Sequence, residues 1–298
     1  MNSDETITWG ELFKYTSVDL GNEQEARWLC EHASGLDASD FNSGLSELVS
    51  ERCGAALREM VRRRLLGEPL QYVMQRWSFR HLDVLVDPRV LIPRPETELV
   101  VQIALDWLRD TVQKINRKVR IADLGTGSGV IGLALASELP LASAEVWLTD
   151  VSNDALDVAR ANLAGLGLVD GDVRLAQGDW FSALPSELKN SFDLIISNPP
   201  YIAVYDASVE SVVRDYEPHL ALYAGTDGMN AYREIISQAG EWLVTDALLV
   251  LEIGHEQGSE IRNLLSENSF VDIEICQDYS QRDRIALARK NNLTSVVP

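Results

Sequence analysis

The sequence predicts an α/β protein, with an open, mostly parallel sheet of seven strands preceded by a small helical domain. Two patterns lead to this prediction. From residue 119 onward, apolar runs typical of buried strands alternate with segments that have helical apolar spacing. Residues 1–75 instead contain helix-like segments alone, with Gly35, Gly44 and Gly67 near their ends or between them.

The N-terminal region is expected to form a helical bundle. Gly67-Glu68-Pro69 is a clear stop signal for its last helix. The longest basic cluster of the chain, residues 61–66, lies inside that helix and is interpreted as a solvated helix face. The expected helices cover residues 9–17, 22–34, 43–51 and 54–66.

A change of pattern separates this region from the sheet. Apolar and polar residues alternate over 71–92, which predicts short strands or a β-hairpin. A helix is expected to follow over 93–110, with Pro95 and Glu96 in its first turn. The predicted domains are therefore a helical domain at 1–75, a β-hairpin linker at 76–92 and a sheet domain at 93–298.

The region beyond residue 118 is expected to build the sheet and the helices that cover it. Sheets of this kind bind ligands beyond the carboxyl ends of their strands. Helices are expected over 130–139, 152–167, 231–243 and 258–268. Strands are expected over 119–124, 144–150, 172–179, 192–197, 247–254, 271–278 and 283–290.

Composition narrows the class of protein. The chain has 298 residues and a net charge of −20, with 26 basic against 46 acidic side chains, which argues against a general nucleic-acid binder. No apolar run is long enough to cross a membrane, and the N-terminus lacks the apolar core of an export signal. Cys30, Cys53 and Cys276 are too far apart for a disulfide framework or a metal site. A cytoplasmic enzyme with no bound metal is expected.

A glycine-rich loop directly follows the first strand of the sheet region. Gly125, Gly127 and Gly129 allow a tight turn and a close approach of a ligand to the backbone. The dinucleotide fingerprint G-x-G-x-x-G fits only from Gly127, whereas Gly125 takes the place at the end of the strand where its first glycine is expected. This displacement by two residues weakens the interpretation as an NAD-dependent oxidoreductase. The stretch from Asp123 to Gly129 instead resembles the D-x-G-x-G-x-G loop of class I methyltransferases, which bind S-adenosylmethionine.

The next two strands end on residues that suit an adenosine-type ligand. Asp150 can accept hydrogen bonds from both hydroxyls of a ribose, in S-adenosylmethionine or in NAD, although a helix cap beside Ser152 is the alternative role. Trp180 or Phe181 follows the third strand and could cover an adenine ring. Spacing alone leaves a buried core aromatic equally open.

The segment "SNPPYI" at 197–202 follows a buried strand and points to a planar NH₂ substrate. The Asn198 side-chain oxygen and the Pro199 carbonyl can accept both N–H groups of such a nitrogen and hold it in line with a methyl donor. Pro199 and Pro200 fix the backbone, and Tyr201 offers a flat face. The motif occurs in methyltransferases of adenine N6, of cytosine N4 and of a glutamine amide, so three targets stay open.

Flanking segments discriminate among these targets. Over roughly residues 67–290, the chain closely resembles the HemK/PrmC family of peptide chain release factor N5-glutamine methyltransferases. The first 65 residues resemble the family only in size and helical character. The segments that carry the resemblance are "GEPLQYVMQRWSF" (67–79), "LIPRPETELVV" (91–101), "DLGTGSGVIGLALA" (123–136), "GDWFSAL" (178–184), "SNPPYI" (197–202), "EPHLALYAGTDGMNAYREII" (217–236) and "LEIGHEQG" (251–258).

The resemblance implies a Rossmann-like class I methyltransferase fold and transfer of a methyl group to the glutamine of the Gly-Gly-Gln motif in class I release factors. Asn198 and Pro199 would be catalytic, and the target glutamine would be held by Asn198, Pro199, Pro200 and Tyr201. S-adenosylmethionine would be contacted by Gly125, Thr126, Gly127, Ser128, Gly129, Asp150, Trp180 and Asn198.

The resemblance also makes the release factor the partner, docked by the helical N-terminal domain, and a monomer is the default oligomeric state. The role of the loop at 92–98 stays open, and residues 279–290 depart from the family pattern D-L-A-G-x-x-R at the last hairpin. The alternatives are a DNA adenine N6 methyltransferase, which the −20 charge opposes, and an inactive binding protein, which the intact motifs oppose.

Overall fold

The computed structural model describes residues 7–168 and 172–291. By its internal contacts the chain divides into two compact units, Met1–Arg76 and Trp77–Pro298. Within the described ranges, no helix is both long and apolar enough to cross a membrane.

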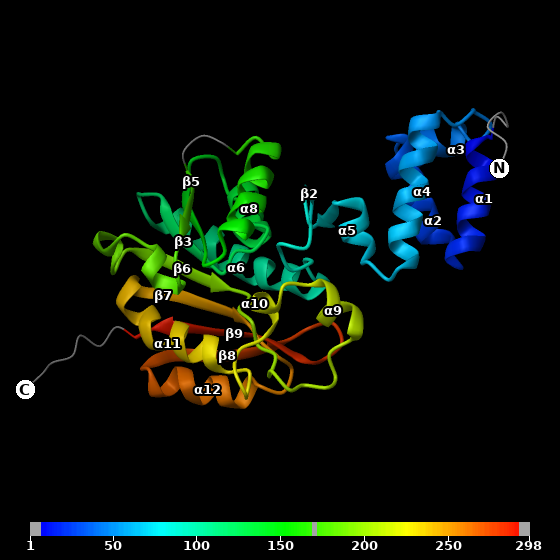
Figure 1. Cartoon of the computed structure of the whole chain (residues 1–298). Helices are drawn as coiled ribbons and strands as arrows, with labels where there is room; N and C mark the ends of the chain where they lie inside the picture. The colour runs from blue at the N-terminus through cyan, green and yellow to red at the C-terminus, as the bar shows by residue number, and fades with distance from the viewer. Residues whose placement is uncertain (1–6, 169–171, 292–298) are drawn as a thin grey trace, which may run out of the picture. The chain divides into compact units, whose positions relative to one another are not determined.

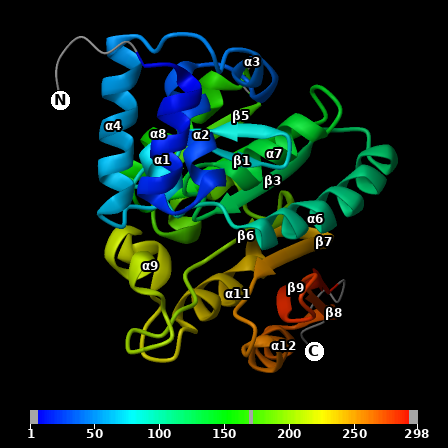
Figure 2. The same ribbon diagram turned by 90° about the vertical axis from the view of Figure 1, so that its right-hand side faces the viewer.

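The N-terminal unit is a helical bundle, as predicted. Helices α1, α2 and α4 lie side by side in it (Figures 1 and 2). Its core contains Trp9, Leu29, Phe41 and Leu57, and Trp9 meets Phe41 edge to face at 5.8 Å between ring centroids. The helices are α1 (Trp9–Leu20), α2 (Glu23–Ser34), α3 (Ala38–Ser43), α4 (Glu51–Leu65) and α5 (Leu70–Met74).

Two local predictions in this region were wrong. The helix expected over 43–51 is not formed. Helix α4 begins only at Glu51, and Asp37 caps an earlier helix, α3, which ends at Ser43 before Gly44. The chain then extends, and Val49 donates its backbone N–H to the carbonyl of Ile7. The alternation over 71–92 predicted strands or a hairpin, but its first residues, 71–74, belong to helix α5.

The basic cluster of α4 is neutralised within its own unit. Arg62 pairs with Glu59, Arg63 with Glu68, and Arg64 with Glu25 at 2.7 Å. Most of this charge therefore serves ion pairs on the bundle surface, in keeping with the solvated helix face that was predicted.

The second unit contains the predicted seven-stranded sheet, in the order β5-β4-β3-β6-β7-β9-β8. All pairs from β5 to β7 are parallel, whereas β9 runs antiparallel to both β7 and β8. Its strands are β3 (Val119–Leu124), β4 (Ala144–Asp150), β5 (Val173–Gln177), β6 (Phe192–Ser197), β7 (Leu243–Glu252), β8 (Phe270–Gln277) and β9 (Asp283–Lys290). The α/β class and the parallel arrangement are thereby confirmed.

Helices cover both faces of this sheet (Figure 1). The helices of the unit are α6 (Pro95–Lys114), α7 (Val130–Glu138), α8 (Asn153–Gly165), α9 (Ser211–Tyr216), α10 (His219–Leu222), α11 (Asn230–Trp242) and α12 (Gly258–Glu267), with 3-10 turns at Trp180–Ala183 and Ser186–Leu188. The sequence patterns had not indicated α9, α10 or the two 3-10 turns.

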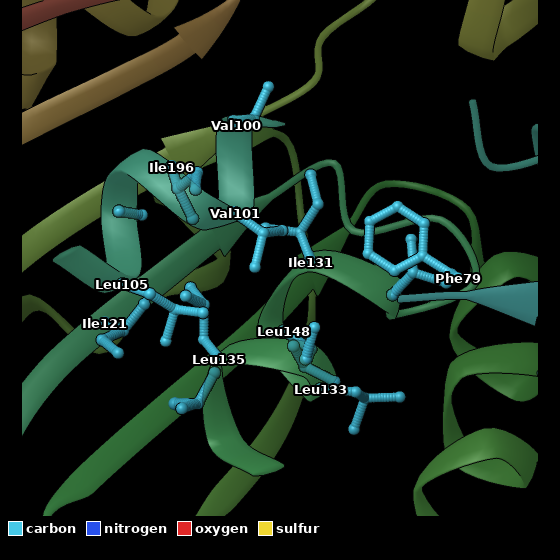
Figure 3. Close-up of a cluster of buried hydrophobic side chains, with 14 of the residues drawn as sticks. Phe79, Val100, Val101, Leu105, Ile121, Ile131, Leu133, Leu135, Leu148 and Ile196 are labelled. Carbon is cyan, nitrogen blue, oxygen red and sulfur yellow. The ribbon is translucent and has the colours of Figure 1, made fainter. Parts of the chain in front are cut away.

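The period-2 alternation of the strands divides the core into two layers. Ile121 and Leu148 pack with α6 and α7 on one face, as Figure 3 shows together with Val101, Leu105 and Ile131. Neighbouring residues on the strands, such as Ala122 and Ile195, face α11 and α12 on the other side. The central strands β3 and β6 and the second half of β7 are thus buried on both faces, which explains their largely apolar sequences.

A short antiparallel hairpin precedes the sheet. Strands β1 (Trp77–Phe79) and β2 (Leu82–Val84) pair with each other, and Phe79 packs into the α6–α7 layer (Figure 3). The hairpin predicted within 76–92 is present. Residues 85–94, which follow it, form an irregular segment.

The C-terminal hairpin forms despite its departure from the family pattern. Asp278 accepts hydrogen bonds from the backbone N–H groups of Ser280 and Arg282, at 2.8 and 3.1 Å, and so closes the turn between β8 and β9. Helix α12 lies against these two strands (Figure 2).

Gly132 tests the tight contact between α7 and the sheet. A Cβ atom there would lie 2.2 Å from Cδ2 of the buried Leu148, so Gly132→Ala is expected to lower the free energy of unfolding by about 1–3 kcal/mol. Gly165→Ala in α8 is the matched control, because a Cβ there has no neighbour within 4 Å. Urea unfolding of both variants is the measurement, and equal stabilities would contradict this packing.

Candidate active site at the carboxyl edge of the sheet

A cavity of about 660 Å³ lies beyond the carboxyl ends of β3, β4, β5 and β6. This volume falls within the roughly 300–1,000 Å³ typical of small-molecule sites. The loop after each of these strands contributes to its wall, through Gly125, Asp150, Trp180 and Asn198. The segment 88–93 and residues 218–225 supply part of the remaining wall.

The glycine loop turns sharply between β3 and α7. Gly125 and Gly129 have φ of +69° and +86°, a left-handed conformation that L side chains rarely adopt. Thr126 donates its N–H to the carbonyl of Thr149, which continues the parallel ladder by one step. Four of the five predicted loop residues, Gly125 to Ser128, line the cavity, whereas Gly129 caps α7 behind it.

Asp123, near the end of β3, fixes this loop through hydrogen bonds. Its Oδ2 accepts hydrogen bonds from Thr126 Oγ1 at 2.5 Å and from the Gly132 N–H at 2.9 Å. Its Oδ1 is buried with no hydrogen-bond partner among the described residues. Burial therefore raises the pKa of Asp123 to about 7, and the nearby charge of Asp150 acts in the same direction.

Asp150 stands at the end of β4 with both oxygens engaged by backbone. Oδ2 accepts from the Gly127 N–H and Oδ1 from the Ser152 N–H, each at 2.9 Å. Ser152, not Asp150, is the residue that caps α8. A carboxylate oxygen has two lone pairs, so each oxygen of Asp150 can still accept a hydrogen bond from a ligand in the cavity.

The two aromatic residues after β5 take different places. Trp180 lines the cavity, and a Cβ built on Gly125 would lie 3.4 Å from its ring. Phe181 is buried and stacks on Trp242 at 5.6 Å between ring centroids. Spacing left open whether these aromatic residues line a site or belong to the core. The structure places Trp180 at the cavity and Phe181 in the core.

Asn198 lines the cavity and points its amide nitrogen away from solvent. Nδ2 donates to Thr97 Oγ1 at 3.3 Å, and Thr97 Oγ1 donates to Glu252 Oε2 at 2.6 Å. Within residues 7–168 and 172–291, no group donates to Asn198 Oδ1 or to the Pro199 carbonyl. Two unpartnered acceptors therefore remain at this corner.

The other residues of the corner differ in whether they line the cavity. Pro200 lines the cavity, whereas Pro199 and Tyr201 are not part of its wall. Tyr201 packs against the α11–α12 layer, and burial raises the pKa of its hydroxyl to about 12. Its carbonyl accepts from Gln257 Nε2 at 3.1 Å. The substrate contact predicted for the Tyr201 ring stays a prediction.

Three residues that sequence patterns did not single out join distant segments at the site. Asn162 of α8 donates to the carbonyl of Ser128 and accepts from the Leu85 N–H, so it ties the glycine loop to the segment after β2. The buried Glu217 accepts from the Ile92 N–H and from Arg94. Thr97 lies in the loop-to-helix stretch 92–98, whose role the sequence left open.

Within the part of the chain that the structure describes, no group of three or more His, Cys, Asp or Glu side chains could hold a metal ion. The predicted site residues instead give the cavity a glycine-rich backbone turn, the carboxylate of Asp150, the indole of Trp180 and the amide of Asn198. The wall also contains Asp154, Asp179, Glu234 and Arg89.

Comparison with known proteins adds to this geometry. Residues 101–220 match the family model of the Methyltransferase small domain, and residues 20–74 match the PrmC N-terminal domain. The chain is 41% identical over 234 residues to the release factor glutamine methyltransferase of Xylella fastidiosa, covering 78% of this chain and 81% of the relative. It is 36% identical over 267 residues to that of Escherichia coli, covering 89% and 91% of the two chains.

A solved structure shows the same fold at low sequence identity. The catalytic domain of hMettl16 in complex with MAT2A 3'UTR hairpin 6 has a TM-score of 0.52 and 16% identity, and the match covers 85% of this chain and 87% of that one. At this identity the likeness concerns the fold alone.

The buried carboxylate under the glycine loop makes a prediction for pH dependence. The pKa of Asp123 is raised in the folded state, so the unfolded chain ionises first and the free energy of unfolding falls as pH rises from about 4 to 7. Asp123→Asn is expected to weaken that fall, with Asp157→Asn on the exposed surface of α8 as the control. Urea unfolding at pH 5 and pH 8 measures both, and identical slopes in wild type and Asp123→Asn would contradict this cause.

Proposed function

This chain belongs to the release factor glutamine methyltransferase family, and we propose that its cavity transfers a methyl group from S-adenosylmethionine to a release-factor glutamine. The acceptor is the side-chain N5 nitrogen of the Gly-Gly-Gln motif in class I release factors. The observation that carries the proposal is Asn198 on the wall of the cavity that the glycine loop and Asp150 also line. The enzyme then acts in the cytoplasm, where it modulates translation termination.

The residues present fit S-adenosylmethionine. The left-handed glycines let a ligand approach the loop backbone, Asp150 has lone pairs left for ribose hydroxyls, and Trp180 places an aromatic residue in the cavity wall. When bound, this group supplies an electrophilic methyl whose bond to sulfur breaks as the bond to nitrogen forms, with the electron pair staying on sulfur. Gly125 to Gly129, Asp150, Trp180 and Asn198 are the residues that we assign to holding it.

The corner Asn198 to Tyr201 is assigned to the target amide. An amide nitrogen is a weak nucleophile, because its lone pair is delocalised. Asn198 Oδ1 and the Pro199 carbonyl can accept its two N–H groups, orient it toward the methyl and stabilise the positive charge that develops on it. The nitrogen then releases one proton to water.

The N-terminal unit is assigned to docking the release factor. It matches the PrmC N-terminal domain over 20–74, and it exposes large apolar side chains, including Val18 on α1 and Leu65 and Leu66 at the end of α4. Exposed apolar groups of this size are typical of protein-binding surfaces when they gather in one patch.

Asp150→Ala is expected to weaken S-adenosylmethionine binding by about 10- to 100-fold, because charge-assisted hydrogen bonds to the ribose are lost. Titration calorimetry measures the affinity. Asp157→Ala, which removes an exposed carboxylate of α8 paired with Arg160, is the control and should bind as wild type does. An unchanged affinity in Asp150→Ala would remove Asp150 from the cofactor site.

The function itself is tested with labelled S-adenosylmethionine and either a release factor or DNA. Label is expected in the Gly-Gly-Gln peptide, and label in DNA alone would contradict the proposal.

Asn198→Ala should lower the rate by about 10²–10³-fold, because one preorganised acceptor is lost. Asn268→Ala, at the far end of α12, is the control, and thermal unfolding should show that both variants keep the fold.

A further inference from the structure

A chain of hydrogen bonds runs from the proposed catalytic amide into the protein core. Asn198 Nδ2 donates to Thr97 Oγ1 at 3.3 Å, and Thr97 Oγ1 donates to Glu252 Oε2 at 2.6 Å. Thr97 and Glu252 are 2% and 1% exposed, so water does not compete for these bonds. The three residues come from β7, the start of α6 and the corner after β6.

The direction of this chain follows from the donors available. An ionised carboxylate only accepts hydrogen bonds, so it takes the single hydroxyl proton of Thr97. Thr97 then has only lone pairs to offer, and they can be met by the NH₂ group of Asn198 but not by its oxygen. The Asn198 oxygen must therefore face the cavity.

We propose that Glu252, acting through Thr97, is a positioning residue that turns the acceptor oxygen of Asn198 toward the substrate amide. The inference rests on the proposed function, because it concerns how the same corner receives the glutamine. If Glu252 gains a proton, it can donate to Thr97, and the Thr97 hydroxyl is free to donate to Asn198. The amide can then turn over and present its NH₂ group to a substrate NH₂, which repels it.

The surroundings of Glu252 place its protonation, and with it the turning of the Asn198 amide, near neutral pH. Burial raises its pKa to about 7, against the bond from Thr97 and the charges of Arg284 and Arg94, which lower it. The other ionisable groups around it are Glu96, which raises the pKa, and the buried hydroxyls of Tyr201 and Tyr232. Arg94 is itself paired with Glu217, and Arg284 with Asp278.

Kinetics of four variants separate positioning from a merely structural contact. Thr97→Val keeps the shape of the side chain but removes the hydroxyl, so kcat should fall about 10- to 100-fold while KM for S-adenosylmethionine changes little. Thr97→Ser restores the hydroxyl and should restore kcat. Thr111→Val is the matched control in the same helix, because Thr111 only donates to the carbonyl of Trp107.

The pH profile supplies a readout that lost stability would not move. Wild type should lose kcat as pH falls through about 7, and Thr97→Val should lack this acid limb. Asp123 also has a pKa near 7, but Thr97→Val leaves Asp123 intact, so loss of the limb assigns it to Glu252. Glu252→Gln can both donate and accept, so it should give a lowered rate with no acid limb.

The orientation can also be read without the reaction. In protein labelled with ¹⁵N-asparagine, the side-chain NH₂ resonance of Asn198, assigned by its absence in Asn198→Ala, should shift with a midpoint near pH 7. The shift should persist in Thr97→Ser and vanish in Thr97→Val. An Asn198 resonance that ignores pH in wild type, or a Thr97→Val enzyme with normal kcat and an intact acid limb, would overturn the inference.

The two proposals fail separately. If wild type methylated no release-factor glutamine, the proposed function would be wrong, whereas the NH₂ titration would still decide how Glu252 and Thr97 orient Asn198.

Discussion

Parallel pairing of β3 with both β4 and β6 is the constraint on which the site depends. It brings the carboxyl ends of these strands to one edge, so loops that are far apart in sequence open into the same space. Side-chain and backbone bonds extend this order past the last strand residues. Thr126 donates its N–H to the Thr149 carbonyl, and Ser197 Oγ donates to the Leu124 carbonyl at 2.6 Å.

Two buried carboxylates hold residues of the cavity wall in place through hydrogen bonds. Asp123 holds the glycine loop through a hydroxyl and a backbone N–H, and Glu252 reaches Asn198 through a hydroxyl. Both are almost fully buried, and burial raises the pKa of each to about 7. Ionised groups in such places oppose stability, but they fix the direction of neighbouring hydrogen bonds in a way that neutral groups do not. These destabilising buried carboxylates lie where the proposed chemistry needs a defined geometry.

The motif residues of the candidate site could be predicted because their roles are local. Glycines that need left-handed backbone, an acidic residue at a strand end and an Asn-Pro-Pro corner are all visible along the chain, and most of them line one cavity. The wrong helix prediction has a physical reason as well. The helix expected at 43–51 did not form, because Asp37 caps an earlier helix that ends at Ser43. Tyr201 packs against the α11–α12 layer, and the substrate contact predicted for its ring stays a prediction.

The sequence by itself determined the succession of the seven sheet strands, the glycine loop and the corner after β6, because apolar periodicity and backbone chemistry depend on neighbouring residues. Only the tertiary structure decided which distant groups meet. Thr97 and Glu252 are 155 positions apart, and Asn162 joins Ser128 to Leu85 across elements with no shared pattern. Such contacts depend on sheet order and helix packing, since a buried hydrogen bond forms only when the fold brings donor and acceptor together away from water.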